Sequence, residues 1–283
     1  MIYQRRRPMN MYNGLGGNAR SAVSGRLIMA GILILFALIS YFGSRVYNPV
    51  TGENQHISIT EDQEIAMGMQ AVPQMLQQFG GEYPDQRLQD YVDQVGFNIV
   101  NNSAAKDTNW QFDFHLLDDP ETINAFALPG GQVFITTALY GKLETEGQLA
   151  GVLGHEIGHV VARHSAQRIA KEELTQGVTG AVVVASGSQG TAQLAQMIGQ
   201  MVNMKYGRDD ELQSDNLGVR FMCQAGYDPQ AMKRVMEILR DSRNGQEPPE
   251  FFSTHPNPEN RIEQIQAAIE QYSQECSNPN PKP

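Results

Sequence analysis

The sequence predicts an α+β protein in which one N-terminal transmembrane helix precedes a predominantly helical domain with a small antiparallel sheet. Three observations support this fold class. An uncharged apolar stretch lies near the N-terminus, several long segments have helical periodicity, and three short β-rich segments are gathered between residues 111 and 136. With 283 residues, of which 41% are hydrophobic, the chain is long enough to bury a sizeable core.

The apolar stretch over residues 27–43 has the length of a short transmembrane helix. Its 17 uncharged residues extend about 26 Å at 1.5 Å per residue. Five arginines precede the stretch and Arg45 follows it, so the positive-inside rule predicts a cytoplasmic N-terminus. We therefore expect a basic cytoplasmic tail over 1–26 and an anchor over 27–43. A cleaved signal peptide is the alternative, although no small-x-small pair follows the stretch.

The balance of charge changes after the first 50 residues. These residues carry +6, whereas the remaining 233 hold 31 acidic against 15 basic residues and carry −16. An acidic body of this kind argues against nucleic acid as a partner. We expect a linker over 44–57, one domain over 58–272 and a disordered proline-rich tail over 273–283. Cys223 and Cys276 could form a disulfide outside the cytoplasm, or remain separate thiols.

Local signals predict where the helices and strands begin. Capping boxes at Thr60–Gln63 and Thr145–Gln148 each precede a segment with helical periodicity. The glycine-rich apolar segment 177–188 is too short to span a bilayer and is predicted to be a buried helix or a mobile flap. Further helices are predicted over about 85–101, 193–221, 229–239 and 261–272, and strands over 111–116, 123–128 and 132–136.

The pattern His155-Glu156-x-x-His159 lies within the helix predicted after the second capping box. Two histidines four residues apart are separated by about 40° around an α-helix and by one turn along it, so both can bind one tetrahedral Zn²⁺. Glu156 is placed between them, where it can take a proton from water at that metal. The flanking Gly154 and Gly158 would let another backbone or a substrate come close.

A catalytic zinc site needs a third protein ligand. Ser165 stands where the metzincin pattern has a histidine, and His164 lies about 140° from His159 around a helix, so neither is expected to reach the metal. Glu211 and Asp215 share one predicted helical face. One carboxylate could bind zinc while the other accepts the N–H of a ligand histidine. Alternatively, both carboxylates belong to a solvated acidic face together with Asp209 and Asp210.

Four segments in order resemble those of M48-family (HtpX-type) metallopeptidases, which implies a zincin-like fold. The resemblance covers roughly residues 58–270. Within the family, the chain looks most like the membrane-associated bacterial quality-control members and their mitochondrial inner-membrane relatives. It shows neither the several long spans of other branches nor the helical repeats of some periplasmic relatives. The four segments are Asn124–Gly131, Gly154–Val160, Arg208–Gly218 and Ser253–Pro256, with Arg261 after them.

The resemblance implies roles for individual residues. Glu211 would be the third ligand of one zinc ion per chain, in a gluzincin site, and Asp215 would support that site. The strand around Asn124–Ala125 would form the edge of a cleft, where a polypeptide substrate adds as a β-strand. His255 or Arg261 would stabilise the oxyanion, or His255 would cap the zinc in a latent state.

These patterns jointly predict a membrane-anchored zinc endopeptidase. Glu156 takes a proton from the zinc-activated water and passes it to the leaving amine. We expect misfolded or membrane-associated proteins as substrates. We also expect a single pass through a bacterial inner membrane, with the catalytic domain in the periplasm; a mitochondrial intermembrane location is the alternative.

A second class of function is a non-catalytic, membrane-anchored chaperone or adaptor that keeps zinc for stability or regulation. The acidic surface carries methionines, including Met67, Met69 and Met75, that could bind unfolded chains. Neither reading fixes an oligomeric state.

Overall fold

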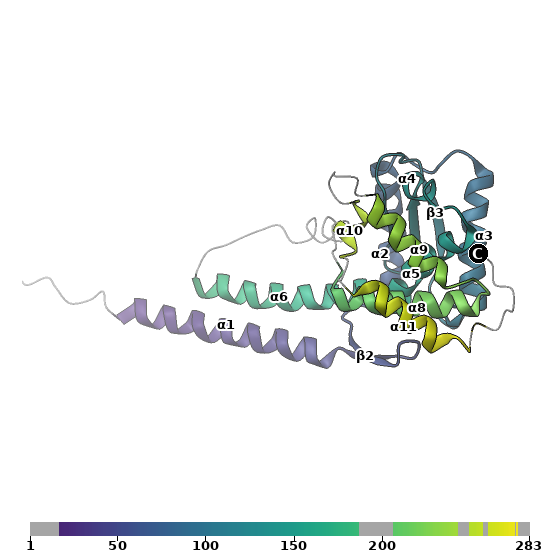
Figure 1. Ribbon diagram of the computed structural model, residues 1–283. Coiled ribbons are helices and arrows are strands. Elements are labelled where there is room, and N and C mark those ends of the chain that lie inside the picture. Colours follow the sequence, from purple (N-terminus) through teal and green to yellow (C-terminus); the bar gives the residue numbers. More distant parts are fainter. Residues whose placement is uncertain (1–16, 187–205, 243–248, 257–259, 275, 277–283) are drawn as a thin grey trace, which may run out of the picture. The chain divides into compact units, whose positions relative to one another are not determined.

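The structure, a computed structural model, describes residues 17–186, 206–242, 249–256, 260–274 and 276. It contains two compact units (Figure 1). One is made of helix α1 (Gly17–Gly43) and the part of α6 (His164–Ser186) after residue 170, and the other holds the rest of the described chain. The predicted fold class is confirmed, because the described chain is mostly helical, has small sheets and begins with an apolar helix.

Helix α1 contains the predicted anchor. By length and composition, Ser24–Gly43 is long and apolar enough to cross a membrane. The helix is described from Gly17, so residues 17–26, which we expected to form part of the basic cytoplasmic tail, are helical. A helix formed by the apolar stretch extends at little cost through neighbouring alanine, serine and arginine residues.

The glycine-rich apolar segment is helical as far as Ser186, and residues 187–188 lie outside the described residues. Within this unit, Gly177 of α6 lies against α1. A Cβ at Gly177 would come within 2.8 Å of the Cβ of Ala37, so the two helices pack closely where the side chain is only a hydrogen.

The three-stranded sheet of the second unit has the strand order β3 (Asp113–Leu117), β5 (Gln132–Thr136), β4 (Ala125–Ala127). β4 and β5 are antiparallel and are joined by a tight turn, in which Gly130 and Gly131 have φ values of 84° and 119°. β3 is parallel to β5, so the prediction of an antiparallel sheet is wrong for this pair. Alternation within a strand does not reveal the direction of its neighbour, and here the chain reaches the edge at β4 before it returns to the centre.

The helices of this unit begin close to the predicted positions. Thr60 and Gln63 form the predicted capping box of α2, and Thr145 caps α5. The helix predicted over 193–221 is described from Arg208 onward. The longer helices are α2 (Glu61–Gln78), α3 (Gln86–Asn102), α5 (Glu146–Val161), α8 (Arg208–Gln224), α9 (Gln230–Asp241) and α11 (Arg261–Tyr272); the short ones are η1 (Ala104–Asp107), α4 (Thr137–Tyr140) and α10 (Phe251–Thr254).

Helix α5 is the central element of this unit and packs against α3, α8 and α9 (Figure 1). Its residues from Gly147 to Val161 are all buried. A Cβ on Gly158 would lie 2.9 Å from the carbonyl oxygen of Ser214, and one on Gly154 would lie 3.4 Å from that of Gly218. The prediction that these two glycines admit another backbone is therefore confirmed, and that backbone is α8.

Residues 44–57, which we expected to be a linker, contain a hairpin of β1 (Arg45–Asn48) and β2 (Glu53–His56). The hairpin is bound to the C-terminal end of α5. The Asn48 side chain donates a 2.8 Å hydrogen bond to the carbonyl oxygen of Val161, and the Gln55 side chain donates one of 2.8 Å to that of Ala162. Because these carbonyl groups lack helical partners, the hairpin caps the helix that carries the two motif histidines.

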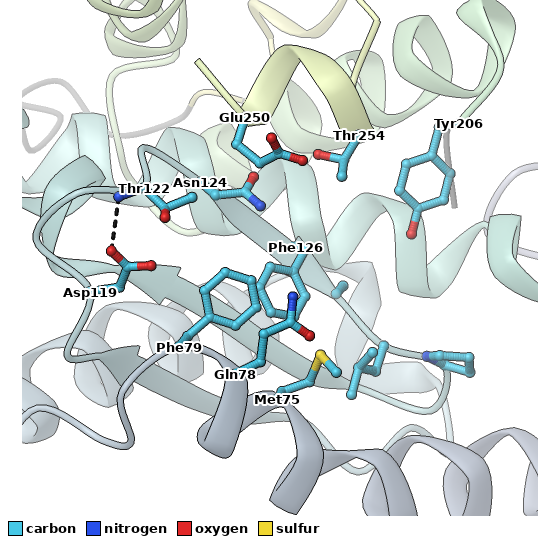
Figure 2. A pocket seen from close by; sticks show the side chains of 13 residues that line it. Met75, Gln78, Phe79, Asp119, Thr122, Asn124, Phe126, Tyr206, Glu250 and Thr254 are labelled. Atoms are coloured by element: carbon cyan, nitrogen blue, oxygen red, sulfur yellow. Dashed lines mark hydrogen bonds between the residues drawn. The ribbon is translucent and has the colours of Figure 1, made fainter. Parts of the chain in front are cut away.

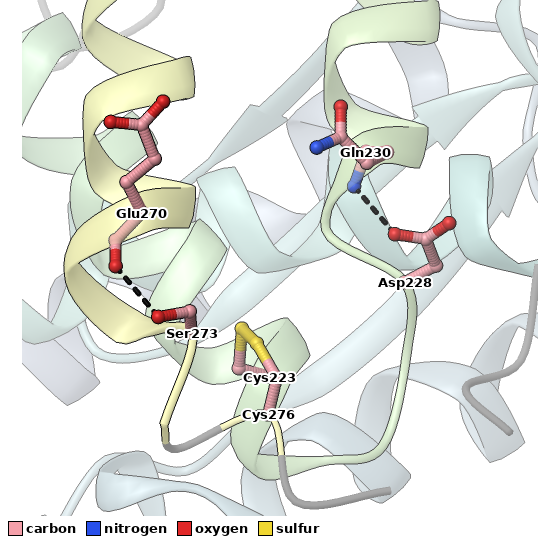
Figure 3. The surroundings of a disulfide bond; sticks show 6 residues. All are labelled: Cys223, Asp228, Gln230, Glu270, Ser273 and Cys276. Atoms are coloured by element: carbon pink, nitrogen blue, oxygen red, sulfur yellow. Dashed lines mark hydrogen bonds between the residues drawn. A yellow bond between two sulfur atoms is a disulfide. The ribbon is translucent and has the colours of Figure 1, made fainter. Parts of the chain in front are cut away.

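The two cysteines are joined. Cys223, near the end of α8, and Cys276, beyond α11, form a disulfide (Figure 3). Of the two states left open by the sequence, the structure therefore has the bridged one. A bridge across 53 residues stabilises the fold chiefly by restricting the unfolded chain.

We expect the substitution Asn48→Ala to lower the free energy of unfolding by about 1–3 kcal/mol, because the buried Val161 carbonyl loses its partner. Urea unfolding of the full chain in detergent, followed by the fluorescence of Trp110, the single tryptophan, measures this change. Asn54 lies exposed on the partner strand, so Asn54→Ala is the matched control. Equal destabilisation by both substitutions would argue against the capping role.

Candidate metal centre

His155 and His159 lie one turn apart on α5 and are both buried. Their Nε2 atoms are 3.0 Å apart, and their ring centroids are 4.6 Å apart. The helix thus directs the same nitrogen of each ring to one point, as the i, i+4 spacing predicts. This convergence places two ligands of the kind that a divalent transition metal prefers.

Helix α8 brings two carboxylates to opposite sides of His155. Oε2 of Glu211 lies 3.5 Å from Nε2 of His155, and Oε1 of Glu211 lies 3.4 Å from Nε2 of His159. Oδ1 of Asp215 lies 2.9 Å from Nδ1 of His155, on the other side of that ring. Glu211 and Asp215 are 0% and 1% exposed, so the alternative of a solvated acidic face is wrong for both.

His255 and Arg261 complete the group from the C-terminal part of the chain. Nδ1 of His255 lies 3.1 Å from Oε1 of Glu211, and its Nε2 lies 3.5 Å from Oε1 of Glu156. Arg261 forms a two-pronged ion pair with Asp215 at 2.6 and 2.9 Å, and its Nη1 lies 3.1 Å from Oε2 of Glu211. Arg261 is 1% exposed and therefore lies behind the carboxylates rather than at an open surface.

The electrostatics of the centre depend on burial and on these pairs. Burial alone would lower the pKa of His155, but its hydrogen bonds to Asp215 and Glu211 outweigh burial and raise the pKa to about 9. Burial lowers the pKa of His159. Burial raises the pKa of Glu156. For Glu211, the neighbouring histidines outweigh burial and hold its pKa well below the usual range.

These residues fit a zinc ion. Among the described residues, one group of side chains can hold a metal: His155, His159, Glu211 and His255, whose ligand atoms all lie within 4.8 Å of one another. Oε2 of Glu211 and Nε2 of His255 are buried and form no hydrogen bond among the described residues; their polar contacts there are the ion-pair distances to Arg261 and Glu156 given above. Nitrogen and carboxylate ligands in this number match a tetrahedral zinc site. Both oxygens of Glu156 are also buried without a hydrogen bond among the described residues, next to the group.

Two neighbours of His159 were not predicted as part of the site. Nδ1 of His164 lies 2.8 Å from Nδ1 of His159, although His164 stays outside the ligand group as expected. The chain turns at Arg163, whose φ is 57°, so His164 does not continue the helix of His159. Tyr206 stacks on His159 with ring centroids 3.8 Å apart. Its place just before the acidic motif gave no sequence signal for this contact.

The predicted substrate strand, β4, lies at the edge of the sheet. Asn124 is buried immediately before it, and its Oδ1 has no hydrogen-bond partner among the described residues. Asn124 lines a cavity together with Tyr206 and Thr254. Because Tyr206 stacks on His159 and Thr254 precedes His255, the strand and the ligand group lie on the same side of the unit.

Comparison with known proteins gives one family and two kinds of relative. Residues 86–269 match the family described as Peptidase family M48. The chain is 34% identical over 225 residues to the beta-barrel assembly-enhancing protease of Yersinia pestis, which covers 76% of the chain and 45% of that protein. It is 33% identical over 246 residues to the mitochondrial metalloendopeptidase OMA1 of Schizosaccharomyces pombe, with 83% and 70% covered. The chain thus spans less than half the length of the bacterial relative.

We expect Asp215→Ala to destabilise the fold by about 3–5 kcal/mol, because it leaves the Arg261 cation buried without its two-pronged partner. Chemical unfolding of the metal-free chain measures the effect. The control is Asp209→Ala, on the same helix but exposed, which should cost less than about 1 kcal/mol. Similar losses for the two variants would show that the pair does not stabilise the buried site.

Proposed function

The chain belongs to peptidase family M48, and from this we propose that it is a membrane-anchored, zinc-dependent endopeptidase. The observation that carries the proposal is the buried group of His155, His159 and Glu211 with the carboxylate of Glu156 beside it. A metal kept for stability alone would not need a further buried carboxylate that lacks a hydrogen-bond partner. A base for hydrolysis would need such a group within reach of the metal.

In this proposal His155, His159 and Glu211 hold one Zn²⁺. When bound, zinc supplies Lewis-acid chemistry: it lowers the pKa of water and polarises the scissile carbonyl. The deprotonated state of Glu211 suits a ligand, since its pKa is held well below the usual range. The two motif histidines present the same nitrogen to the ion.

Glu156 acts as the proton carrier. Burial raises its pKa, and a carboxylate with a raised pKa is a better proton acceptor than an exposed one. It takes a proton from the attacking water and delivers it to the amine of the leaving peptide. Its position between the two ligand histidines keeps it next to the reacting atoms throughout.

Asp215 and Arg261 position His155. Asp215 accepts the N–H of the imidazole nitrogen that faces away from the ligand group, and so fixes the ring. Arg261 in turn holds Asp215 through two hydrogen bonds. These contacts favour a positioning role for Arg261 over the oxyanion role implied by the resemblance.

His255 is proposed as a cap. Nδ1 of His255 lies 3.3 Å from Nε2 of His155, so its ring lies within the ligand group. A catalytic zinc has three protein ligands and one open position, and His255 stands where a fourth ligand would close that position. This placement favours the latent-state role over the oxyanion role.

The proposed substrates are polypeptides in misfolded or membrane-associated proteins. A chain in an extended conformation would pair with the edge strand beside Asn124 and Ala125, where the buried Oδ1 of Asn124 can accept a peptide N–H. The relatives are named as a protease and a metalloendopeptidase, which supports polypeptide substrates.

We place the chain in a bacterial inner membrane with its catalytic unit in the periplasm. Three features support this location: the arginines before the apolar helix, the disulfide, which is typical of oxidising compartments, and the bacterial relatives. Because one relative is mitochondrial, the intermembrane space is the alternative location of the catalytic unit.

The alternative function, a non-catalytic chaperone or adaptor, has weaker support from the surface. Of the methionines that suggested it, Met69 is 54% exposed, but Met75 is 1% exposed and packs in an apolar cluster with Leu128 and Phe134. The prediction of a surface formed by all three methionines is therefore wrong.

We expect Glu156→Gln to lower the rate of casein cleavage at least about 10²-fold while one zinc per chain remains bound. The base is lost, but the metal ligands are kept. Cleavage by the full chain and metal content by mass spectrometry are measured together. Glu144→Gln, an exposed residue just before the same helix, serves as the control. Chelation should stop cleavage by the parent chain, and added Zn²⁺ should restore it.

Full cleavage by Glu156→Gln would remove the mechanism. A zinc-loaded parent chain that binds casein and never cuts it would instead support the chaperone or adaptor.

We expect His255→Ala to raise the rate of peptide cleavage several-fold, because it removes the proposed cap while His155, His159 and Glu211 remain. Initial rates on a short peptide and zinc stoichiometry are the measurements. A rate that falls while zinc stays bound would favour the oxyanion role.

A further inference from the structure

A cavity of about 300 Å³ lies beside the edge strand of the sheet. Figure 2 shows the rings of Phe79 and Phe126 next to each other, with Asn124, Glu250 and Thr254 across the cavity from Gln78. Its volume is at the lower end of the range for ligand sites. It therefore suits one large side chain better than a cofactor.

The walls of the cavity are mainly apolar. Phe79, at the end of α2, packs on Phe126 of β4 with ring centroids 5.3 Å apart, and Met75 and Leu128 continue this surface. Phe126 also stacks on Phe134 of the central strand at 4.9 Å, which fixes its ring. A side chain that enters the cavity would thus meet rigid aromatic faces.

The pairing of β4 directs a bound peptide toward this cavity. The backbone N–H of Thr136 donates to the carbonyl of Asn124, and that of Leu128 donates to the carbonyl of Gln132. By the alternation of an antiparallel ladder, the backbone groups of Ala125 and Ala127 then point to the outer edge.

A peptide paired at that edge places alternate side chains on each face of the sheet. On one face the side chains of Ala125 and Ala127 are buried in the main apolar core, and Ala127 also borders the cavity. The other face carries Phe126 and Leu128, which line the cavity. Every second side chain of the peptide therefore faces the cavity side.

The cavity also adjoins the ligand group. Tyr206 lines it and stacks on His159, and Thr254, which also lines it, is the residue before His255. A side chain held there belongs to a peptide that passes the metal. At the rim, the carboxylates of Asp119 and Glu250 would repel an acidic side chain.

We infer that this cavity is a specificity pocket for one large apolar side chain, aromatic or long aliphatic, of an extended polypeptide substrate. The inference rests on the proposed peptidase function for the identity of the ligand. It adds that Phe79, Phe126 and Gln78 determine which residue near the scissile bond is accepted.

The test measures binding, so that it does not depend on turnover. The full-length, zinc-loaded chain with Glu156→Gln is titrated with labelled polar heptapeptides that differ only at the central residue: Phe, Leu, Ala or Asp. Burial of a large apolar side chain gives a preference of roughly tenfold or more for Phe over Ala, with Asp weakest. Fluorescence anisotropy in detergent gives the affinities.

Two cavity substitutions and one control, each in the Glu156→Gln background, connect the preference to the cavity. Gln78→Trp adds bulk at the exposed rim and should reduce the preference for Phe at least fivefold. Gln77→Trp, its exposed neighbour on the same helix that does not line the cavity, is the matched control and should keep the preference. Phe79→Ala enlarges the cavity and should shift the preference from Phe toward Trp in a peptide with Trp at the centre.

Two results would contradict the proposed specificity pocket. One is equal binding of the Phe and Ala peptides, and the other is an equal loss of the preference in the Gln78 and Gln77 variants. Casein cleavage by the parent chain separates this failure from that of the proposed function. Cleavage without a side-chain preference would refute the pocket alone, whereas a preference in binding without any cleavage would refute the peptidase alone.

Discussion

The close contact between α5 and α8 is the constraint on which the metal centre depends. Gly158 lets the backbone of α8 approach until Ser214 donates a 2.6 Å hydrogen bond to the carbonyl of His155. At this distance a glutamate and an aspartate one turn apart on α8 reach the two histidines. A side chain at Gly158 would push α8 away, because its Cβ would meet the Ser214 backbone at 2.9 Å, and the ligands would separate.

The close packing of α8 on α5 also buries two carboxylates, and a cation at the start of α11 compensates their charge. Buried carboxylates are costly unless cations or hydrogen-bond donors face them. Arg261 is the first residue of α11 and supplies one positive charge to both Asp215 and Glu211. Each imidazole also has a contact on its outer side, His155 with Asp215 and His159 with His164. The inner nitrogens remain directed at one point.

The sequence predicted those parts of the site that lie on single helices. The i, i+4 spacing predicted that His155 and His159 share one helical face, as do Glu211 and Asp215, whereas only the family resemblance implied that Glu211 faces the histidines. The contacts made by Tyr206 and His164 could not be predicted, since they depend on the left-handed turn at Arg163 and on the fold that brings residue 206 to α5. The same holds for the hairpin at 45–56 and for the direction of β3, because both are set by partners distant in sequence.

The bridge between Cys223 and Cys276 has a consequence for the integrity of the chain. His255 and Arg261 both lie within the covalent ring that it closes. A single cut anywhere in that ring leaves two fragments that stay linked, so a nicked molecule keeps its full mass until it is reduced. After a cut between Cys223 and His255, the disulfide would still attach His255 and Arg261 covalently to α8.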